Sequence, residues 1–350
     1  MITYRLATPS DNQQLLELTS GAGMDGEISL RIDRHPDFFR LLKLRGESKV
    51  FVAEDNGTII GSVCVSLQQV FVGGQIFPVQ YIGDLRVATS FRNNGIGLQL
   101  CNEAATYVLS KGTDLVFLTV SKGNTKPFAF FKNRPHIPDF ESVGSFNIHQ
   151  FVGKKRRVFH PAFTPESTSS SEELIQFLNS HSSKYQLGSV ITAEKLEGVD
   201  SFVIRQNKKI IAAMCLIDTM EFKQNVVTKL STKLKYLLSG INSIYKISGV
   251  SRMPLVDQPV RMMYIKYLAV KSGEKELVRL MINHARNIVY DKSYSFVSFG
   301  LHEKDPLNKY FSGMLKLTFN SVGMLLSVKN NKQLVETVKM GIPFEDYSLV

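Results

Sequence analysis

The first half of the chain alternates between strand-like and helix-like spacing of its apolar residues. Runs rich in β-branched and aliphatic residues predict strands at residues 2–6, 50–54, 58–65, 79–87 and 115–120. Helical spacing is found in three stretches: after Ser10 and Asp11, over 33–45 and over 98–108. Asp55-Asn56-Gly57, between two strand patterns, predicts a hairpin turn. The predicted order is strand, two helices, three antiparallel strands, helix and strand.

A glycine-containing segment connects the strand at 79–87 to the helix that follows it. Its sequence is Arg92-Asn93-Asn94-Gly95-Ile96-Gly97. The first N–H groups of a helix lack intrahelical partners and lie at the positive end of its dipole, and glycines let an anion approach them closely. The third glycine of a dinucleotide fingerprint and the Gly-Lys-Ser/Thr of a Walker loop are both absent. We therefore expect a pyrophosphate site, with an ordinary glycine-rich turn as the alternative.

The pattern Arg-x-x-Gly-x-Gly, after a strand that ends Asp84-Leu85-Arg86-Val87, resembles the acyl-CoA loop of the GNAT superfamily of N-acetyltransferases. The order of elements over residues 1–150 is similar to that family too. This resemblance implies an α/β fold whose twisted, mixed, largely antiparallel sheet is flanked by helices. It also implies acetyl-CoA as co-substrate, held by residues 92–97, with the backbone of Leu85, Arg86 and Val87 contacting pantetheine and the acyl carbonyl.

Two residues beyond the strand at 115–120 also bear on the resemblance. Asn124 matches an asparagine that lies near pantetheine in the family. Phe131 occupies the position of a tyrosine that often reprotonates the departing CoA thiolate. A phenyl ring cannot donate a proton, so that role must fall to another group or to water. We expect both residues to lie near the cofactor, with Phe131 packing a helix against the sheet.

The reaction of such a site needs a group that accepts a proton from the attacking amine. Asp84 is the first candidate, because the family often places its acid at this level of the strand. The alternative is that Asp84 forms a structural ion pair with Arg86 or Arg5, since perturbed carboxylates serve both purposes. Tyr81 is a second candidate for proton transfer.

Other chemistries find little support in the residues. The three cysteines are far apart and lie in apolar patterns, as expected of a reduced protein in the cytoplasm. The seven histidines show no metal-ligand spacing, so no metal site is expected. No stretch approaches the roughly 18 apolar residues of a membrane span, and we expect neither a signal peptide nor a membrane partner.

Composition and charge divide the chain into two parts. Basic, proline and serine residues between positions 154 and 171 predict a linker. We expect a catalytic GNAT domain at residues 1–155, a linker at 156–172 and a second domain at 173–350. Residues 1–150 hold 14 Lys and Arg and 14 Asp and Glu, so residues 151–350 hold the remaining 28 and 17 and carry the whole net charge of +11.

The second part shows a similar order of elements, which predicts a degenerate GNAT-like copy. Strand patterns at 202–205 and 210–215, a strand at 262–270, helical spacing over 277–288, a strand at 296–299 and a helix at 307–315 repeat the earlier plan. Residues 271–275 replace the glycine loop, and Glu274 would repel a phosphate. Residues 222–247 are expected to form one amphipathic helix, read either as a surface helix with solvated lysines or as a basic rim.

These patterns together predict an acyl-CoA-dependent N-acyltransferase, most simply one that transfers acetyl to a primary amine by direct attack in a ternary complex. One alternative is an aminoacyl-tRNA-dependent transferase whose basic half binds RNA. The other is an acyl-CoA-binding sensor without catalysis. The acceptor is expected to be a small-molecule or peptide amine, and a nucleic-acid partner is disfavoured because aromatic residues are not interleaved with the basic clusters. The sequence does not determine the oligomeric state.

Overall fold

The computed structural model describes residues 1–21, 28–122, 138–155, 162–271 and 274–350. The strands are β1 (Ile2–Leu6), β2 (Ile28–Asp33), β3 (Glu47–Asp55), β4 (Thr58–Val72), β5 (Gln75–Val87), β6 (Leu115–Ser121), β7 (Glu141–Val152), β8 (Glu166–Thr168), β9 (Gly188–Ser189), β10 (Asp200–Gln206), β11 (Lys209–Asp218), β12 (Gln224–Leu230), β13 (Met262–Val270), β14 (Phe296–His302) and β15 (Lys316–Ser327). The α-helices are α1 (Asn12–Ser20), α2 (Phe38–Arg45), α3 (Ile96–Ser110), α4 (Glu172–Ser182), α5 (Thr232–Ser248), α6 (Lys275–Asp291) and α7 (Lys332–Met340).

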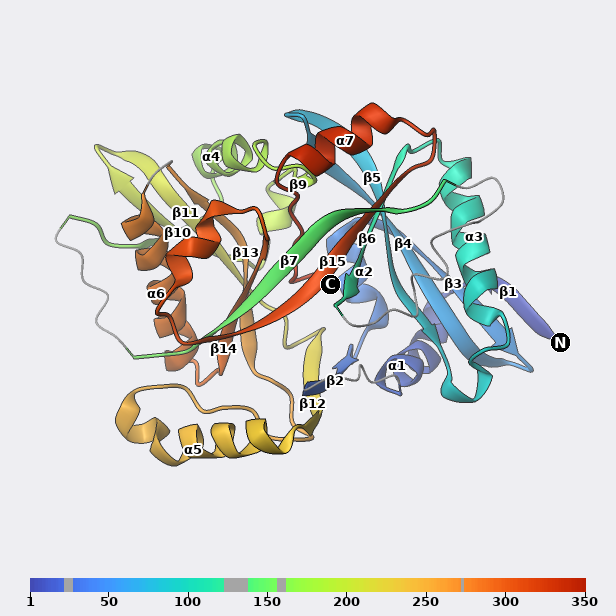
Figure 1. Cartoon of the computed structure of the whole chain (residues 1–350), viewed down its shortest axis with the longest axis horizontal. Coiled ribbons are helices and arrows are strands. Elements are labelled where there is room, and N and C mark those ends of the chain that lie inside the picture. The colour runs from blue at the N-terminus through green and yellow to red at the C-terminus, as the bar shows by residue number, and fades with distance from the viewer. Residues whose placement is uncertain (22–27, 123–137, 156–161, 272–273) are drawn as a thin grey trace.

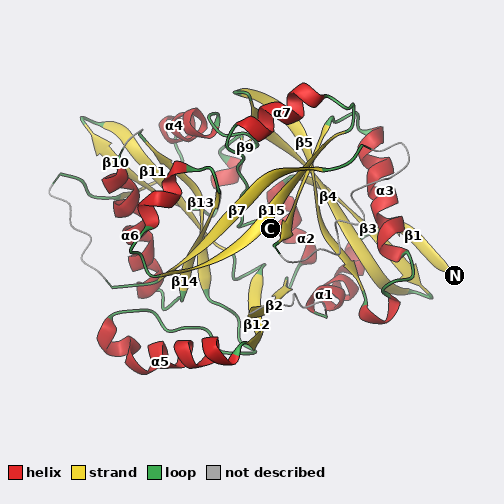
Figure 2. Ribbon diagram, viewed as in Figure 1, coloured by secondary structure: helices red, strands yellow, loops and turns green. Residues whose placement is uncertain are grey.

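A single mixed sheet runs through the molecule (Figure 1). Its strand order is β1-β3-β4-β5-β6-β15-β7-β14-β13-β11-β10-β8, and β9 pairs with β4. The predicted α/β class with a mixed sheet flanked by helices is confirmed (Figure 2).

The two ends of this sheet repeat the same pattern of strands. β1-β3-β4-β5 and β8-β10-β11-β13 are each antiparallel throughout. A parallel pair follows in each case, β5 with β6 and β13 with β14. The helices agree with this repeat, since α1 and α4 follow the first strand and α3 and α6 follow the fourth.

Two long strands at the centre cross between the halves. β15, from the end of the chain, pairs with β6 of the first half, whereas β7 pairs with β14 of the second half. β7 and β15 also pair with each other. The halves therefore share one continuous sheet. The predicted linker begins just after β7, residues 156–161 lie outside the described part of the chain, and the domain boundaries stay a prediction.

Helices cover opposite faces of each half. In the first half, α1 and α2 bury one face of β3 and β4, and α3 buries the other. In the second half, α4 and α6 divide the faces of β10 and β11 in the same way. Gly61 lets α3 approach β4 closely, because a Cβ there would lie 2.9 Å from the Leu100 side chain and 3.1 Å from the Arg86 carbonyl oxygen.

Some predicted helices differ in the structure. Residues 224–230 of the predicted helix at 222–247 form β12, which pairs with β2, and only 232–248 are α-helical. Residues 306–311 form a 3-10 helix where an α-helix was predicted at 307–315. The helix predicted from residue 33 begins at Phe38, because Asp33 ends β2 and Asp37 caps α2. β12 could not be predicted, because its stability comes from a partner strand nearly 200 residues away.

The last residues of the chain lie near the centre of the molecule (Figure 1). Glu345, Asp346, Tyr347, Ser348 and Leu349 are all buried. Lys223 donates a hydrogen bond of 3.1 Å to the carbonyl oxygen of Tyr347, and the Tyr347 ring lies directly over Gly300 of β14. The absence of a side chain at Gly300 thus allows this segment to pack on the sheet.

We expect Gly300→Ala to lower the free energy of unfolding by about 1–3 kcal/mol, because the added methyl group overlaps the buried Tyr347 ring. Gly240→Ala is the matched control. A Cβ at Gly240, inside α5, meets no atom within 4 Å, so this change should raise the free energy of unfolding by about 0.5–1 kcal/mol. Denaturant unfolding measures both values, and an unchanged Gly300→Ala protein would contradict the packing described.

Candidate functional site

β5 and β6 diverge partway along their length. They pair only over residues 79–81 and 115–117. Beyond Tyr81, β5 continues to Val87 beside β4, while β6 continues to Ser121 beside β15. Within the described residues, the edge of β5 that faces β6 has no strand partner over residues 82–87.

A bulge interrupts β5 in this divergent part. Asp84 has φ of +54°, and Asp84 and Leu85 together lie opposite Val63 of β4. The extra residue changes which side chains share a face, so Ile82, Leu85 and Val87 all pack on the α3 side of the sheet. Asp84 and Arg86 lie close to each other, with Asp84 Oδ1 4.0 Å from Arg86 Nη2.

The predicted pyrophosphate loop leads directly into α3. Gly95 is the N-cap residue and has φ of +77°, a conformation that favours glycine. The first intrahelical hydrogen bond runs from the Gln99 N–H to the Gly95 carbonyl oxygen, so the N–H groups of residues 96–98 have no acceptor within the helix. Arg92, Asn93, Asn94 and Gly95 are exposed, and the first turn of α3 contains no acidic residue. This end of α3 can therefore attract an anion.

The equivalent helix of the second half differs at its start. Glu274 is the N-cap of α6, and Glu276 lies in the first turn. Two carboxylates at this position oppose the binding of phosphate. Of these two equivalent helix ends, only the start of α3 is thus suited to bind an anion.

Asp84 is held by arginines. Arg34, which is only 3% exposed, places Nη2 2.7 Å from Asp84 Oδ2. Burial alone would raise the pKa of Asp84, but the charges of Arg34 and Arg86 outweigh it and hold this pKa below its usual value. Arg5, named above as a possible partner, instead pairs with Asp11 and Glu54. A carboxylate stabilised in this way is a weak base, which favours the structural role.

Tyr81 lies where β5 and β6 separate. Its hydroxyl is 3.1 Å from Thr119 Oγ1 on the divergent part of β6, and the Arg45 guanidinium lies 3.5 Å above its ring. Burial raises the pKa of Tyr81 to about 12, so the hydroxyl stays protonated at neutral pH. A protonated Tyr81 hydroxyl can donate a hydrogen bond there, and its role in proton transfer stays a prediction.

Glu345 is a carboxyl group that the sequence did not indicate. It accepts a hydrogen bond of 3.3 Å from Arg45, the same arginine that stacks on Tyr81. Burial raises the pKa of Glu345 to about 7, although Arg45 acts in the opposite direction. A carboxyl group with this pKa can accept and release a proton at neutral pH.

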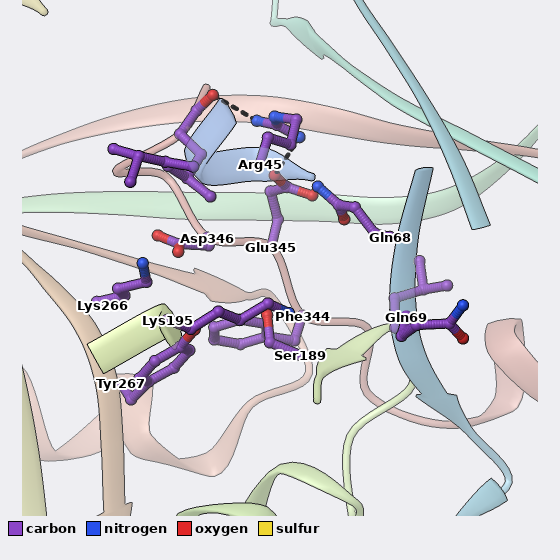
Figure 3. Close-up of a pocket in the computed structure, with 13 residues that line it drawn as sticks. Arg45, Gln68, Gln69, Ser189, Lys195, Lys266, Tyr267, Phe344, Glu345 and Asp346 are labelled. Carbon is purple, nitrogen blue, oxygen red and sulfur yellow. Dashed lines mark hydrogen bonds and ion pairs between the residues drawn. The ribbon is translucent and has the colours of Figure 1, made fainter. Parts of the chain in front are cut away.

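Glu345 and Arg45 line a polar cavity between the two halves (Figure 3). The cavity is also lined by Lys195, Lys266 and Asp346. It lies on the same face of the sheet as Tyr81, opposite α3. Sequence patterns could not identify this group, because its members come from four separate segments of the chain.

A second cavity is apolar and lies on the α3 side of the sheet. It is bounded by the C-terminal half of α3, by β6 and by β15. Ile82 of β5 also lines it, close to the bulge at Asp84. The surrounding side chains carry no charge.

The remaining sequence predictions concern contacts with pantetheine, metal ions and membranes. Asn124 and Phe131 lie outside the described residues. In the described part of the chain, no group of three or more His, Cys, Asp or Glu residues is arranged to hold a metal ion. None of the described helices is both long and apolar enough to span a membrane.

Comparison with known proteins supports the geometry of the first half. Residues 16–134 match the model of the acetyltransferase (GNAT) family. This stretch is a GNAT domain. It contains the bulged strand β5, the glycine loop and α3. The match supports acyl transfer from an acyl-CoA as the type of reaction. A search of curated protein sequences finds no match to the chain.

Solved structures show the same fold over nearly the whole chain. A GCN5-related N-acetyltransferase from Anabaena variabilis matches with a TM-score of 0.55 at 11% identity, covering 94% of this chain and 73% of that protein. Saccharomyces cerevisiae N-myristoyltransferase with bound myristoyl-CoA matches with a TM-score of 0.61 at 10% identity, covering 93% and 79%. At such low identity, these structures establish the fold and not the substrate.

We expect Arg34→Met to lower the free energy of unfolding by roughly 3 kcal/mol at pH 7, because Asp84 would lose its main partner while its side chain stays largely shielded from solvent. The pKa of Asp84 is lowered in the folded protein, so the pair stabilises above the unfolded pKa of about 3.9, and this contribution is lost as the pH falls below it. The difference in the free energy of unfolding between the variant and the wild type should therefore become smaller in acid.

Arg40→Met is the control, since Arg40 pairs with Glu221 at the surface. It should cost at most about 1 kcal/mol. Equal losses for the two variants in denaturant titrations would show that the Arg34–Asp84 pair has no special importance.

Proposed function

We propose that this protein is an acyl-CoA-dependent N-acyltransferase that transfers acetyl from acetyl-CoA to a primary amine by direct attack in a ternary complex. The main observation is that the divergence of β5 from β6, the bulge at Asp84 and the unpaired start of α3 follow one another along a single segment. Together they can bind the thioester, the pantetheine arm and the pyrophosphate.

The cofactor is proposed to lie along β5 toward α3. The N–H groups of residues 96–98, with Arg92, Asn93 and Asn94 beside them, bind the pyrophosphate. Leu85, Arg86 and Val87 lie beside the acyl carbonyl and pantetheine, where backbone N–H groups can stabilise the oxyanion. The contact of Asn124 and Phe131 with pantetheine stays a prediction, because both lie outside the described residues.

Glu345 is proposed to accept the proton of the amine. Asp84 was the first candidate from the sequence, but its carboxylate is committed to Arg34 and its pKa is lowered. Glu345 lines the cavity on the Tyr81 side of the sheet and has a pKa close to the working pH. In this arrangement the amine enters from the face opposite α3.

The apolar cavity bears on the acyl group. Because it is lined by Ile82, near the bulge, and by no charged side chain, it could accommodate an acyl chain longer than acetyl. One of the structural relatives is described with bound myristoyl-CoA. A longer acyl-CoA is therefore the second candidate donor.

The second half is proposed to be a GNAT-like copy without a CoA site. It repeats the strand order of the first half, but carboxylates occupy the start of α6. We place the protein in the cytoplasm, where its three buried cysteines would stay reduced. An aminoacyl-tRNA-dependent enzyme and a non-catalytic sensor are the alternatives that the following measurements separate.

We expect acetyl-CoA to bind the wild type with micromolar affinity in calorimetry, and Arg92→Glu, Gly95→Asp to abolish binding. The double change places negative charge at the start of α3 and a side chain at a residue with positive φ. Lys111→Glu, Gly57→Asp is the matched control, because it repeats both kinds of change at the other end of α3 and in the β3–β4 turn.

The same titration with octanoyl-CoA tests the acyl chain. Tighter binding of octanoyl-CoA than of acetyl-CoA would favour the longer donor. If neither compound binds the wild type, the acyltransferase proposal fails, and RNA binding becomes the first alternative.

We expect kcat/KM to rise with pH through about pH 7 for the wild type, because Glu345 must lose its proton to act as the base. Glu345→Gln should lower kcat by about 100-fold or more and remove this rise, whereas Asp84→Asn should leave the pH profile unchanged. Release of free CoA thiol, with the best amine from a screen, provides the assay. If the rise of kcat/KM with pH is lost in Asp84→Asn and kept in Glu345→Gln, the base is Asp84. CoA binding without turnover on any amine would favour the sensor.

A further inference from the structure

Helix α5 has apolar side chains on two different faces. Leu234, Leu238 and Ile241 pack inward on the second half of the molecule. Tyr236, Ile244 and Ile247 are exposed, by 74%, 55% and 91% respectively. Packing of the inward face accounts for the contact between α5 and the rest of the protein. It does not account for the apolar residues that are exposed on the outward face.

The outward residues form one stripe along the helix. Positions 236, 240, 244 and 247 follow the spacing of a single helical face. Gly240, between the apolar residues, leaves the surface open, since a Cβ there meets no atom within 4 Å. α5 lies at the margin of the molecule (Figure 2), so an extended surface can reach this stripe.

Basic residues surround the stripe. α5 contains Lys233, Lys235 and Lys246 and no acidic residue, and all three lysines are exposed. Lys229 just before the helix and Arg252 just after it are also exposed. The helix therefore combines an exposed apolar strip with five exposed basic side chains within it and beside its two ends.

This combination selects among possible partners. A second copy of the same face would bring like charges together, which disfavours self-association. Nucleic acid binds basic residues through its phosphates, and the aliphatic residues Ile244 and Ile247 contribute nothing to such contacts. An anionic lipid surface matches both properties, because lysines contact headgroups while aliphatic and aromatic side chains enter the acyl boundary.

We propose that α5 docks the protein on an anionic membrane surface, as a peripheral contact through Tyr236, Ile244 and Ile247 with the flanking lysines. The sequence analysis predicted no membrane partner, but it tested only for segments that span a membrane, and this proposal departs from that prediction. The docking face is separate from the acyl-CoA site, so the proposal stands independently of the proposed reaction.

The absence of tryptophan from the chain allows a direct test. Tyr236→Trp introduces a single indole on the stripe, and Ile76→Trp introduces one at another exposed apolar site, on β5. With vesicles of phosphatidylcholine and phosphatidylserine, we expect a blue shift of the fluorescence for Tyr236→Trp and none for Ile76→Trp. Vesicles of phosphatidylcholine alone should give no shift, and added salt should reverse the shift.

Two further variants, made in the Tyr236→Trp protein, separate charge from apolar contact. Lys233→Glu, Lys235→Glu should weaken vesicle binding by at least about tenfold. Ile244→Ser, Ile247→Ser should remove co-sedimentation with vesicles while leaving the melting temperature unchanged, since both residues are exposed.

Several results would overturn the proposal. They are the absence of a shift with phosphatidylserine vesicles, equal shifts for both reporters, or full binding by either double variant. Sedimentation velocity that shows a dimer lost in Ile244→Ser, Ile247→Ser would make the stripe an interface between copies. Binding to single-stranded RNA in place of vesicles would assign the basic face to nucleic acid.

Discussion

The exchange of β7 and β15 is the constraint on which the rest of the structure depends. Each half of the sheet is extended at its inner edge by a strand from the other half of the sequence. Neither half can complete its backbone pairing alone, because an unpaired strand edge would be left where β15 or β7 now lies. The two halves are thus expected to fold and unfold together.

The same exchange places the end of the chain in the middle of the molecule. α7 follows β15, and the chain then returns across the sheet to bury residues 345–349. Lys223 binds the Tyr347 carbonyl there, and burial with Arg34 and Arg45 nearby lowers the pKa of Lys223 to about 7. Burying so many ionisable groups together is costly unless they are paired. Their concentration beside the divergent strands is typical of functional sites, where perturbed pKa values gather.

The separation of β5 from β6 connects this charged region to the cofactor side. On one face lie Tyr81, Arg45 and Glu345; on the other lie Leu85, Ile82 and α3. A thioester between the strands would be reachable from both faces. In the proposed reaction, the donor and the acceptor therefore approach from opposite faces of the sheet and meet near the bulge.

Sequence patterns predicted the parts of this arrangement that are local. The strand at 79–87, the glycine loop and the following helix could be recognised because glycine positions and apolar spacing act over a few residues. The pairing of β12 with β2 and the exchange of β7 and β15 could not be predicted. The residues of a strand do not indicate which other strand will form hydrogen bonds with its backbone. The pairs Arg34–Asp84 and Arg45–Glu345 join residues 50 and 300 positions apart, so no spacing rule indicates them. From the sequence alone, Asp84 could be either a base or a structural partner, and its ion pair with Arg34 favours the structural role.

Amide hydrogen exchange with and without acetyl-CoA tests the central claim most directly. Binding between β5 and β6 predicts slower exchange in peptides that cover residues 84–98, with little change in those from β13 and the start of α6, the equivalent elements of the second half. Protection that is equal in both halves, or absent from residues 84–98, would contradict the assignment of the site.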